Sequence, residues 1–249
     1  MKLIFKLAYF TIFLVATSSF AQNETVLKDE TNTWFTVLNR LTINPKWSVS
    51  NEIHERTGAF LTEQGTFLWR PSVDYHLGEN VELSVGYSYI NNKPNHPNPN
   101  PKIGVIENNI WEQVLLKNKI GNVNFQHRLR QEHRWFDTVG QNGDGSYSKT
   151  GTDYANRFRY RLTLNTPLKT FENGKVIFFQ AFDEIWIPQN SGLAPKSLSR
   201  NWMYLGVGYK FNTKTNLQIG YMNQRDVLAN NTFITTSILQ TTFVKNFDL

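Results

Sequence analysis

The chain has 249 residues, a formal net charge of +6 and no cysteine. The lack of cysteine excludes a disulfide scaffold, a thiolate metal site and a lipid-modified N-terminal cysteine. The basic residues are spread along the chain without a nucleic-acid-binding motif, which excludes a nucleic-acid partner. No His-x-Glu-x-x-His or related ligand spacing occurs, so we expect neither a metal nor another cofactor.

The first residues have the pattern of a secretory signal peptide. Lys2 and Lys6 give a positive start, Leu7–Val15 is mostly apolar, and Ser19-Phe20-Ala21 offers small residues where a signal peptidase reads. We expect cleavage between Ala21 and Gln22, which makes residues 1–21 the signal peptide and residues 22–249 a single domain. A retained membrane helix is the weaker alternative, because the apolar stretch is short.

Extended strands are predicted along nearly all of the mature chain. No stretch after Gln22 approaches the ~18–20 apolar residues of a membrane-spanning helix. Side-chain character alternates with a period of two, as in strands, and most runs match the ~9–11 residues that cross a membrane at a tilt. The expected strands are Thr33–Ile43, Lys46–Arg56, Thr66–Leu77, Val81–Ile90, Asn108–Lys117, Val123–Phe136, Tyr154–Asn165, Lys175–Ile187, Arg200–Phe211, Asn216–Gln224 and Thr232–Phe247.

The connections between these strands alternate in length, which is typical of outer-membrane barrels. Short turns rich in Asn and Gly are expected at Asn44-Pro45, Gly78–Asn80, Asn118–Asn122 and Asn212–Thr215, with a longer one at Thr166–Gly174. Longer loops are expected at Thr57–Gly65, Asn91–Glu107, Asp137–Asp153 and Pro188–Ser199. Aromatic residues make up 14% of the chain and gather in or beside strands, as the interfacial girdles of such barrels do.

These features predict an all-β fold, an antiparallel transmembrane β-barrel in the outer membrane of a Gram-negative cell. Bacterial single-chain barrels have even strand numbers, whereas eleven runs are visible. Three explanations stay open: an extra strand within Asn23–Thr31, one wrongly assigned run, or an N-terminus that threads the lumen. We favour twelve strands and take ten as the next choice. The alternation that ends at Phe247 resembles the signal read by the barrel insertion machinery. That machinery, outer-membrane lipids and small solutes are the expected partners.

One face of two neighbouring strands carries most of the candidate site. Alternate positions of Val123–Phe136 and Tyr154–Asn165 are charged and face one side, which we expect to be the lumen. These residues are Arg128, Arg130, Glu132, Arg134, Arg157, Arg159 and Arg161. Like charges on adjacent strands repel one another, so Glu52 and Glu184 are expected as further counter-charges, while the registers of the strands that carry Glu112 and Glu184 both stay open. Two interpretations follow: a charged constriction in a narrow channel, or an ion-pair network that fills a structural barrel.

An enzyme is the second class of function considered. Outer-membrane lipases place a Ser–His pair near the lipid, and His127 and His133 face outward by the same alternation. No serine lies in their own strand or in its expected partner, and no Gly-x-Ser-x-Gly motif occurs, so no catalytic residue is assigned. Asp144 sits in a Gly-rich run that lacks the rest of a calcium-loop pattern, and a polar hairpin tip is expected there. A surface protein that binds through its outer loops is the third class.

The chain also resembles a known family. The resemblance rests on Lys46-Trp47-Ser48-Val49, Trp69-Arg70-Pro71, Val85-Gly86-Tyr87, Arg157-Phe158-Arg159-Tyr160-Arg161, Asp183-Glu184 and Tyr204-Leu205-Gly206-Val207-Gly208-Tyr209, with Trp34 in the opening strand. These segments are similar to the barrels of domain of unknown function 2490, over nearly the whole mature chain. The resemblance implies an outer-membrane β-barrel of unknown activity in Gram-negative bacteria, and it supplies no catalytic residues.

Overall fold

The computed structural model describes residues 25–93, 103–190, 192–228 and 232–249, with only the backbone described for residues 25–30. The predicted signal peptide and its cleavage site lie outside these residues, as does part of the predicted loop Asn91–Glu107. Among the described residues, no helix is long and apolar enough to cross a membrane.

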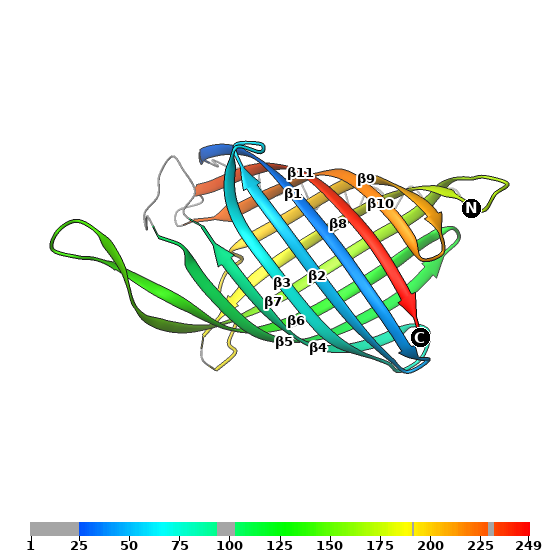
Figure 1. Cartoon of the computed structure of the whole chain (residues 1–249), viewed down its shortest axis with the longest axis horizontal. Helices are drawn as coiled ribbons and strands as arrows, with labels where there is room; N and C mark the ends of the chain where they lie inside the picture. The colour runs from blue at the N-terminus through cyan, green and yellow to red at the C-terminus, as the bar shows by residue number, and fades with distance from the viewer. Residues whose placement is uncertain (1–24, 94–102, 191, 229–231) are drawn as a thin grey trace.

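The described chain forms eleven strands that close into one barrel (Figure 1). Each strand pairs with the next one along the chain in antiparallel fashion, and β1 pairs with β11 to close the ring. The strands are β1 (Thr25–Asn44), β2 (Trp47–Gly58), β3 (Glu63–His76), β4 (Val81–Asn92), β5 (Val105–Ile120), β6 (Val123–Gln141), β7 (Tyr147–Thr170), β8 (Val176–Gln189), β9 (Arg200–Asn212), β10 (Thr215–Val227) and β11 (Thr232–Asp248).

The predicted strand number of twelve is wrong, because the described barrel closes with eleven. When successive strands alternate in direction, an odd number makes the first and last strands run the same way, so their pairing is parallel. β1 and β11 pair in this manner from Thr25↔Thr232 to Thr42↔Asp248, and their arrows run side by side in Figure 1. The extra strand sought within Asn23–Thr31 does not exist as a separate element, because Thr25–Thr31 is the first part of β1.

The strands are steeply tilted, and the register shows it. The paired residues define a path from strand to strand around the barrel. The path starts at Thr42 of β1, crosses to Ser48 of β2 and Asp74 of β3, continues through the other strands, and returns to β1 at Lys28. Such a stagger requires strands inclined to the barrel axis. The short turns and the C-terminus gather at one end, and the longer connections gather at the other, which we call the loop end.

The longest hairpin, β6–β7, differs from the prediction. Asp137–Asp153 was expected to be a loop, but β6 and β7 stay paired up to Gln141↔Tyr147 and leave only residues 142–146 as a turn. This hairpin extends beyond the rest of the barrel at the loop end (Figure 1). Thr and Ser side chains on its arms add cross-strand hydrogen bonds, including Thr150 to Thr138 at 3.2 Å, that support the extension.

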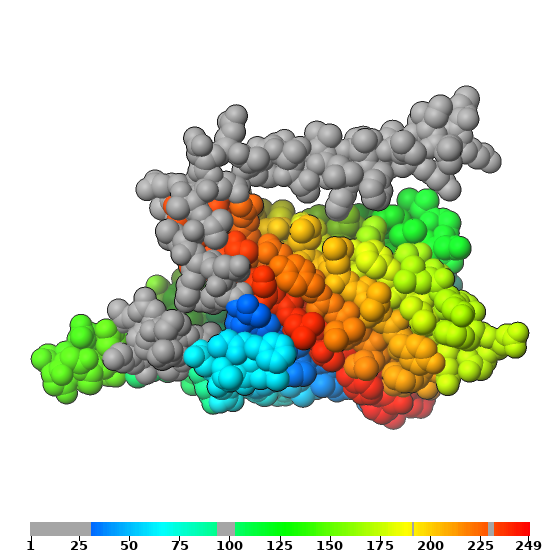
Figure 2. Space-filling view, turned by 90° about the horizontal axis from the view of Figure 1, so that it is seen from above, coloured from blue at the N-terminus to red at the C-terminus, as the bar shows by residue number. Residues whose placement is uncertain are grey.

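Alternating side chains divide the wall into two faces. The outward positions hold the exposed large apolar residues, among them Val85 at 61%, Leu205 at 51% and Ile219 at 49%. Figure 2 shows the packed outer surface of the wall where β11 lies beside β1. The inward positions hold most of the buried charged residues, including Arg70, Glu132 and Arg159. An apolar outside with a charged inside inverts the arrangement of a soluble core.

Inward glycines give large aromatic rings room to lie flat against the wall. A Cβ on Gly206 or Gly220 would come within 2.2 Å and 2.5 Å of the Tyr204 side chain, and one on Gly208 would come within 2.2 Å of the Phe178 ring. On β4, Gly86 makes the same space for Trp111. These aromatic rings therefore cover bare backbone instead of crossing the barrel, and the interior keeps open volume.

Candidate functional site

The candidate arginines of β6 and β7 lie directly opposite one another in the barrel interior. Their register is Arg128↔Arg161, Arg130↔Arg159 and Glu132↔Arg157, so two of these three rows place arginine against arginine. Charges of the same sign in such positions repel one another. The interior therefore needs carboxylates that reach between the strands.

Two completely buried glutamates bring these arginines together. Glu184 on β8 accepts hydrogen bonds from Arg128 at 2.5 Å, from Arg159 at 2.7 Å and from Arg161 at 2.5 and 2.7 Å. Glu132 accepts from Arg159 at 2.7 Å and pairs with Arg157. Because Arg159 bridges both glutamates, six charged residues form one continuous network of charge-assisted hydrogen bonds.

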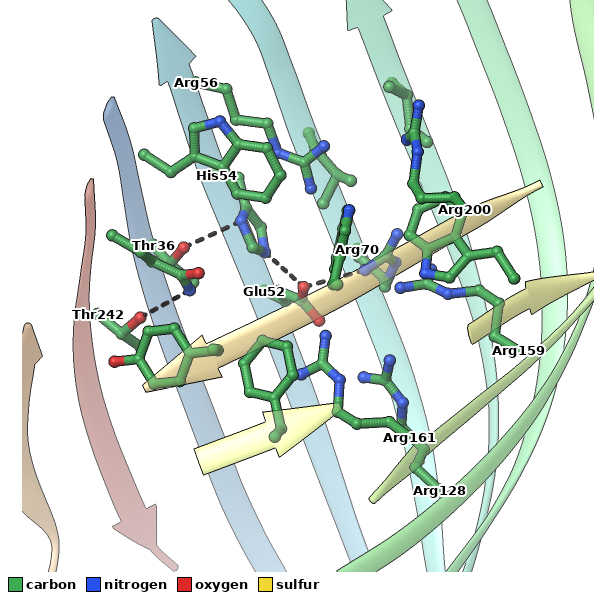
Figure 3. Close-up of a pocket in the computed structure, with 18 of the residues that line it drawn as sticks. Thr36, Glu52, His54, Arg56, Arg70, Arg128, Arg159, Arg161, Arg200 and Thr242 are labelled. Carbon is green, nitrogen blue, oxygen red and sulfur yellow. Dashed lines mark hydrogen bonds and ion pairs between the residues drawn. The ribbon is translucent and has the colours of Figure 1, made fainter. Parts of the chain in front are cut away.

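Two further candidates lie on either side of this network. Arg134 forms a two-pronged pair with Glu107 of β5, both bonds measuring 2.7 Å. On the opposite wall, Glu52 accepts from Arg70 at 2.9 Å and bonds to His54, whose other ring nitrogen lies 2.9 Å from the Thr36 hydroxyl (Figure 3). Glu52 is therefore tied to β3 by Arg70 and to β1 through His54.

Two arginines of the interior have no carboxylate partner among the described residues. Arg130 donates to Gln113 at 2.8 and 3.0 Å and stacks over Trp111, but its Nη1 is buried without an acceptor. Arg56 stacks over Trp34 with its guanidinium carbon 3.9 Å from the ring centre, and its Nε is likewise buried without an acceptor. An unpaired buried cation is costly, so both positions favour an anion.

Two cavities occupy the lumen along its length. The outer cavity, of about 540 Å³, lies toward the loop end and is drawn in Figure 3. The inner cavity, of about 430 Å³, lies toward the short turns. We call them the outer and inner chambers. Charged residues that line both chambers, and so form a waist between them, are Glu52, Arg70, Arg128 and Arg161.

The inner chamber carries a second charged group. Arg40 of β1 donates to both oxygens of Glu82, at 2.7 and 3.0 Å, and lies 3.3 Å from Asp74. Lys117 of β5 also reaches Glu82, at 3.2 Å. These contacts tie β1, β3, β4 and β5 together near the short-turn end.

The sequence prediction missed several residues of the chambers. These are Arg40, Arg56, Arg70, Glu107 and Arg200, and the aromatic residues Trp34, Trp111, Trp186 and Trp202. The alternation of side chains along β2 could have indicated one of them. Arg56 lies two residues after His54 and four after Glu52, so all three face the same side of the strand. The long reach of these side chains across several strands gives no comparable signal in the sequence.

The outward face of β5–β7 holds a separate polar group. Glu112, whose orientation was open, points outward and lies 3.3 Å from His133. His133 also contacts Tyr154 at 3.0 Å and Asn156 at 2.9 Å. His127 contacts Tyr160 at 2.8 Å. Among the described hydrogen bonds, neither histidine has a serine or aspartate partner, the pairing that would favour a lipid-modifying enzyme.

Asp144 closes the turn of the β6–β7 hairpin. Its carboxylate accepts hydrogen bonds from the backbone and the hydroxyl of Ser146, at 2.9 and 2.6 Å, and these bonds lower the pKa of the Asp144 carboxyl. In the described part of the chain, no three His, Asp or Glu side chains converge as a metal site would require.

Comparison with protein families adds one result. The family model described as Protein of unknown function (DUF2490) matches residues 31–234, which is most of the chain. The chain belongs to this family. The DUF2490 match runs from β1 into β11. It includes every residue that lines the two chambers except four on β11, namely Gln240, Thr242, Val244 and Asn246. No curated protein and no solved structure matches the chain.

Proposed function

We propose that this DUF2490 protein is an outer-membrane barrel whose interior is a narrow passage for small anions. The loop end would face outward and the short turns would face the periplasm. The apolar outer wall, the strand length and the signal-like N-terminus support this placement. The two candidate alternatives, a lipid-modifying enzyme and a surface protein that binds through its loops, have less support in the described geometry.

The surplus of positive charge in the lumen carries the proposal. Eight arginines line the outer chamber: Arg56, Arg70, Arg128, Arg134, Arg157, Arg159, Arg161 and Arg200. They meet five carboxylates, namely the lining residues Glu52, Glu107 and Asp226 and the buried Glu132 and Glu184. The cations thus outnumber the anions, and rings of arginine and lysine select anions in pores.

The two arginines without a carboxylate partner would serve as successive binding positions. Arg56 lines the outer chamber and Arg130 lines the inner one, with the waist between them. Conduction requires sites that attract an ion without holding it too tightly, and several weak sites in a row meet this condition. The paired arginines would instead brace the wall and set the width of the waist.

Single-channel recording tests the proposal. The refolded protein in a planar bilayer should conduct and, under a KCl gradient, give a reversal potential on the anion-selective side. The variant Arg128→Ala with Arg161→Ala removes two waist side chains while Arg159 still neutralises Glu184, so conductance should rise and anion preference should fall.

Lys46→Ala is the matched control, because Lys46 is an exposed cation in a short turn. It should conduct as the parent does. A parent protein that inserts but does not conduct would overturn the passage and leave the ion-pair network as the filling of a structural barrel. A waist variant with parental conductance and selectivity would show that these arginines do not form the constriction.

A further inference from the structure

We infer that the outer chamber is a binding site for an organic anion that has a planar apolar part, with Arg56 as the principal anion-binding residue. This inference rests on the proposed passage, since it names the class of anion that the chamber would hold. One wall of the outer chamber carries aromatic residues on which several of its arginines stack.

That wall is unusually rich in aromatic residues. Three tryptophans form a row with Trp202 in the middle. Its ring centre lies 5.3 Å from that of Trp34 and 4.5 Å from that of Trp186. Phe182 and Tyr204 belong to the same buried cluster and stack on each other, with ring centres 4.9 Å apart and nearly parallel planes. The remaining apolar lining is Leu38, Leu68 and Ile90. Arginine side chains stack over Trp34, Trp186 and Phe182, yet all five rings line the chamber. An organic anion with an apolar part would use both the guanidiniums and these rings, whereas a small inorganic anion would use the guanidiniums alone.

Two residues that line the same chamber each have a buried donor without an acceptor. The Arg56 Nε and the Trp186 indole nitrogen are both buried without a hydrogen-bond partner, and Trp186 is only 5% exposed. Buried donors in folded proteins are normally satisfied, so these two residues, like Arg128, Arg130 and Trp111, are left short of acceptors by the described part of the protein. A carboxylate or another oxyanion provides such acceptors.

Arg56 differs from its neighbours in the chamber in being uncommitted. Arg157 is paired with Glu132, Arg159 with Glu132 and Glu184, and Arg200 with Asp226. Among the described residues, Arg56 has no carboxylate partner and stacks over Trp34 and, farther away, Trp202. Its terminal nitrogens are therefore available for a two-pronged contact with an oxyanion. The volume of about 540 Å³ also lies in the range of small-molecule sites.

Titration calorimetry on the detergent-refolded protein tests this site without requiring a membrane. The probes are benzoate, which carries both features, benzyl alcohol, which lacks the charge, and inorganic phosphate, which lacks the ring. Benzoate should bind more tightly than both of the others. Arg56→Gln should weaken benzoate binding about tenfold or more, because a charged hydrogen-bonding partner is lost.

Lys46→Gln is the matched control, because it also changes a cation to an amide, but at an exposed position in a short turn outside the residues that line the two chambers. Its benzoate affinity should stay within about twofold of the parent value, as for independent sites. Equal binding of benzoate and benzyl alcohol by the parent protein would overturn the role of the charge, and equal binding of benzoate and phosphate would overturn the role of the aromatic wall. Both comparisons use the unaltered chain, so they hold even if a variant does not refold.

Conductance and binding separate the two proposals. Benzoate binding without conductance would support the site and overturn the passage. Conductance without benzoate binding would overturn the site and leave the passage intact.

Discussion

Replacing Glu184 with glutamine should be among the most destabilising single changes in the barrel wall. The Glu184 carboxylate is completely buried and accepts four hydrogen bonds of 2.5–2.7 Å from Arg128, Arg159 and Arg161. Glutamine keeps the shape but removes the charge. Arg159 retains Glu132, whereas Arg128 and Arg161 then have no carboxylate within 4 Å among the described residues.

The expected loss in unfolding free energy is about 3–5 kcal/mol, the typical cost of removing one partner from a buried ion pair. A loss of that size changes the unfolding equilibrium more than a hundredfold. Urea unfolding in detergent micelles, followed by tryptophan fluorescence, would measure it. Glu172→Gln is the control, because Glu172 is exposed in the turn between β7 and β8.

A second variant tests whether the cost is electrostatic. Glu184→Gln combined with Arg128→Gln removes one charge of each sign, so it should lose less stability than the two single variants predict together. If Glu184→Gln unfolds at the same urea concentration as Glu172→Gln, the buried network does not stabilise the barrel. Strictly additive effects in the double variant would refute the coupling between Glu184 and Arg128.

Two further outcomes follow from the wall. Ile219 faces outward, so Ile219→Arg should impair insertion into lipid vesicles by about 2–4 kcal/mol. The neighbouring Gln218 faces the chambers, so Gln218→Arg should insert nearly as the parent does. Equal insertion of the two variants would contradict the inside–outside assignment. Gly220→Ala places a Cβ 2.5 Å from a backbone oxygen of β9 and 2.5 Å from the Tyr204 ring, so urea unfolding should show a loss of about 1–3 kcal/mol in unfolding free energy. Gly143→Ala is the control, because its Cβ meets nothing within 4 Å, and its unfolding free energy should be nearly unchanged.

Strand parity accounts for what the sequence could predict. On β6 and β7 the charged and apolar side chains alternate with few exceptions, so both the strands and the charged side were readable from spacing alone. On β5 the pattern failed, because apolar residues occupy both faces around Glu112, and only the register with β6 shows that Glu112 points outward. Alternation therefore predicts orientation only where the two faces differ chemically.

The sequence could not predict how the barrel closes or how far the β6–β7 hairpin extends, because both depend on pairing between separate segments of the chain. Whether β1 pairs with β11 in parallel is decided when the ring closes, and no residue of β1 alone specifies it. The arms of the β6–β7 hairpin are polar, so they lack the hydrophobic alternation that marks a strand. Their pairing is carried by backbone bonds and by contacts such as Thr150 with Thr138, which composition does not reveal.

The use of arginine in place of lysine explains how the lumen can be crowded with charge and still keep a hydrogen-bonding group uncommitted. A guanidinium can bridge two carboxylates with its edge while its face stacks on an indole, and Arg159 does both, with Glu132 and Glu184 at its edge and Trp186 under its face. A lysine ammonium is a point charge without such a face. Arginines saturated by carboxylates are thereby fixed in the wall, while Arg56, fixed by stacking alone, keeps its hydrogen-bonding edge free. If the outer chamber binds an anion as proposed, stability and anion binding depend on different arginines, so variants of the two groups should separate into those that change unfolding and those that change affinity.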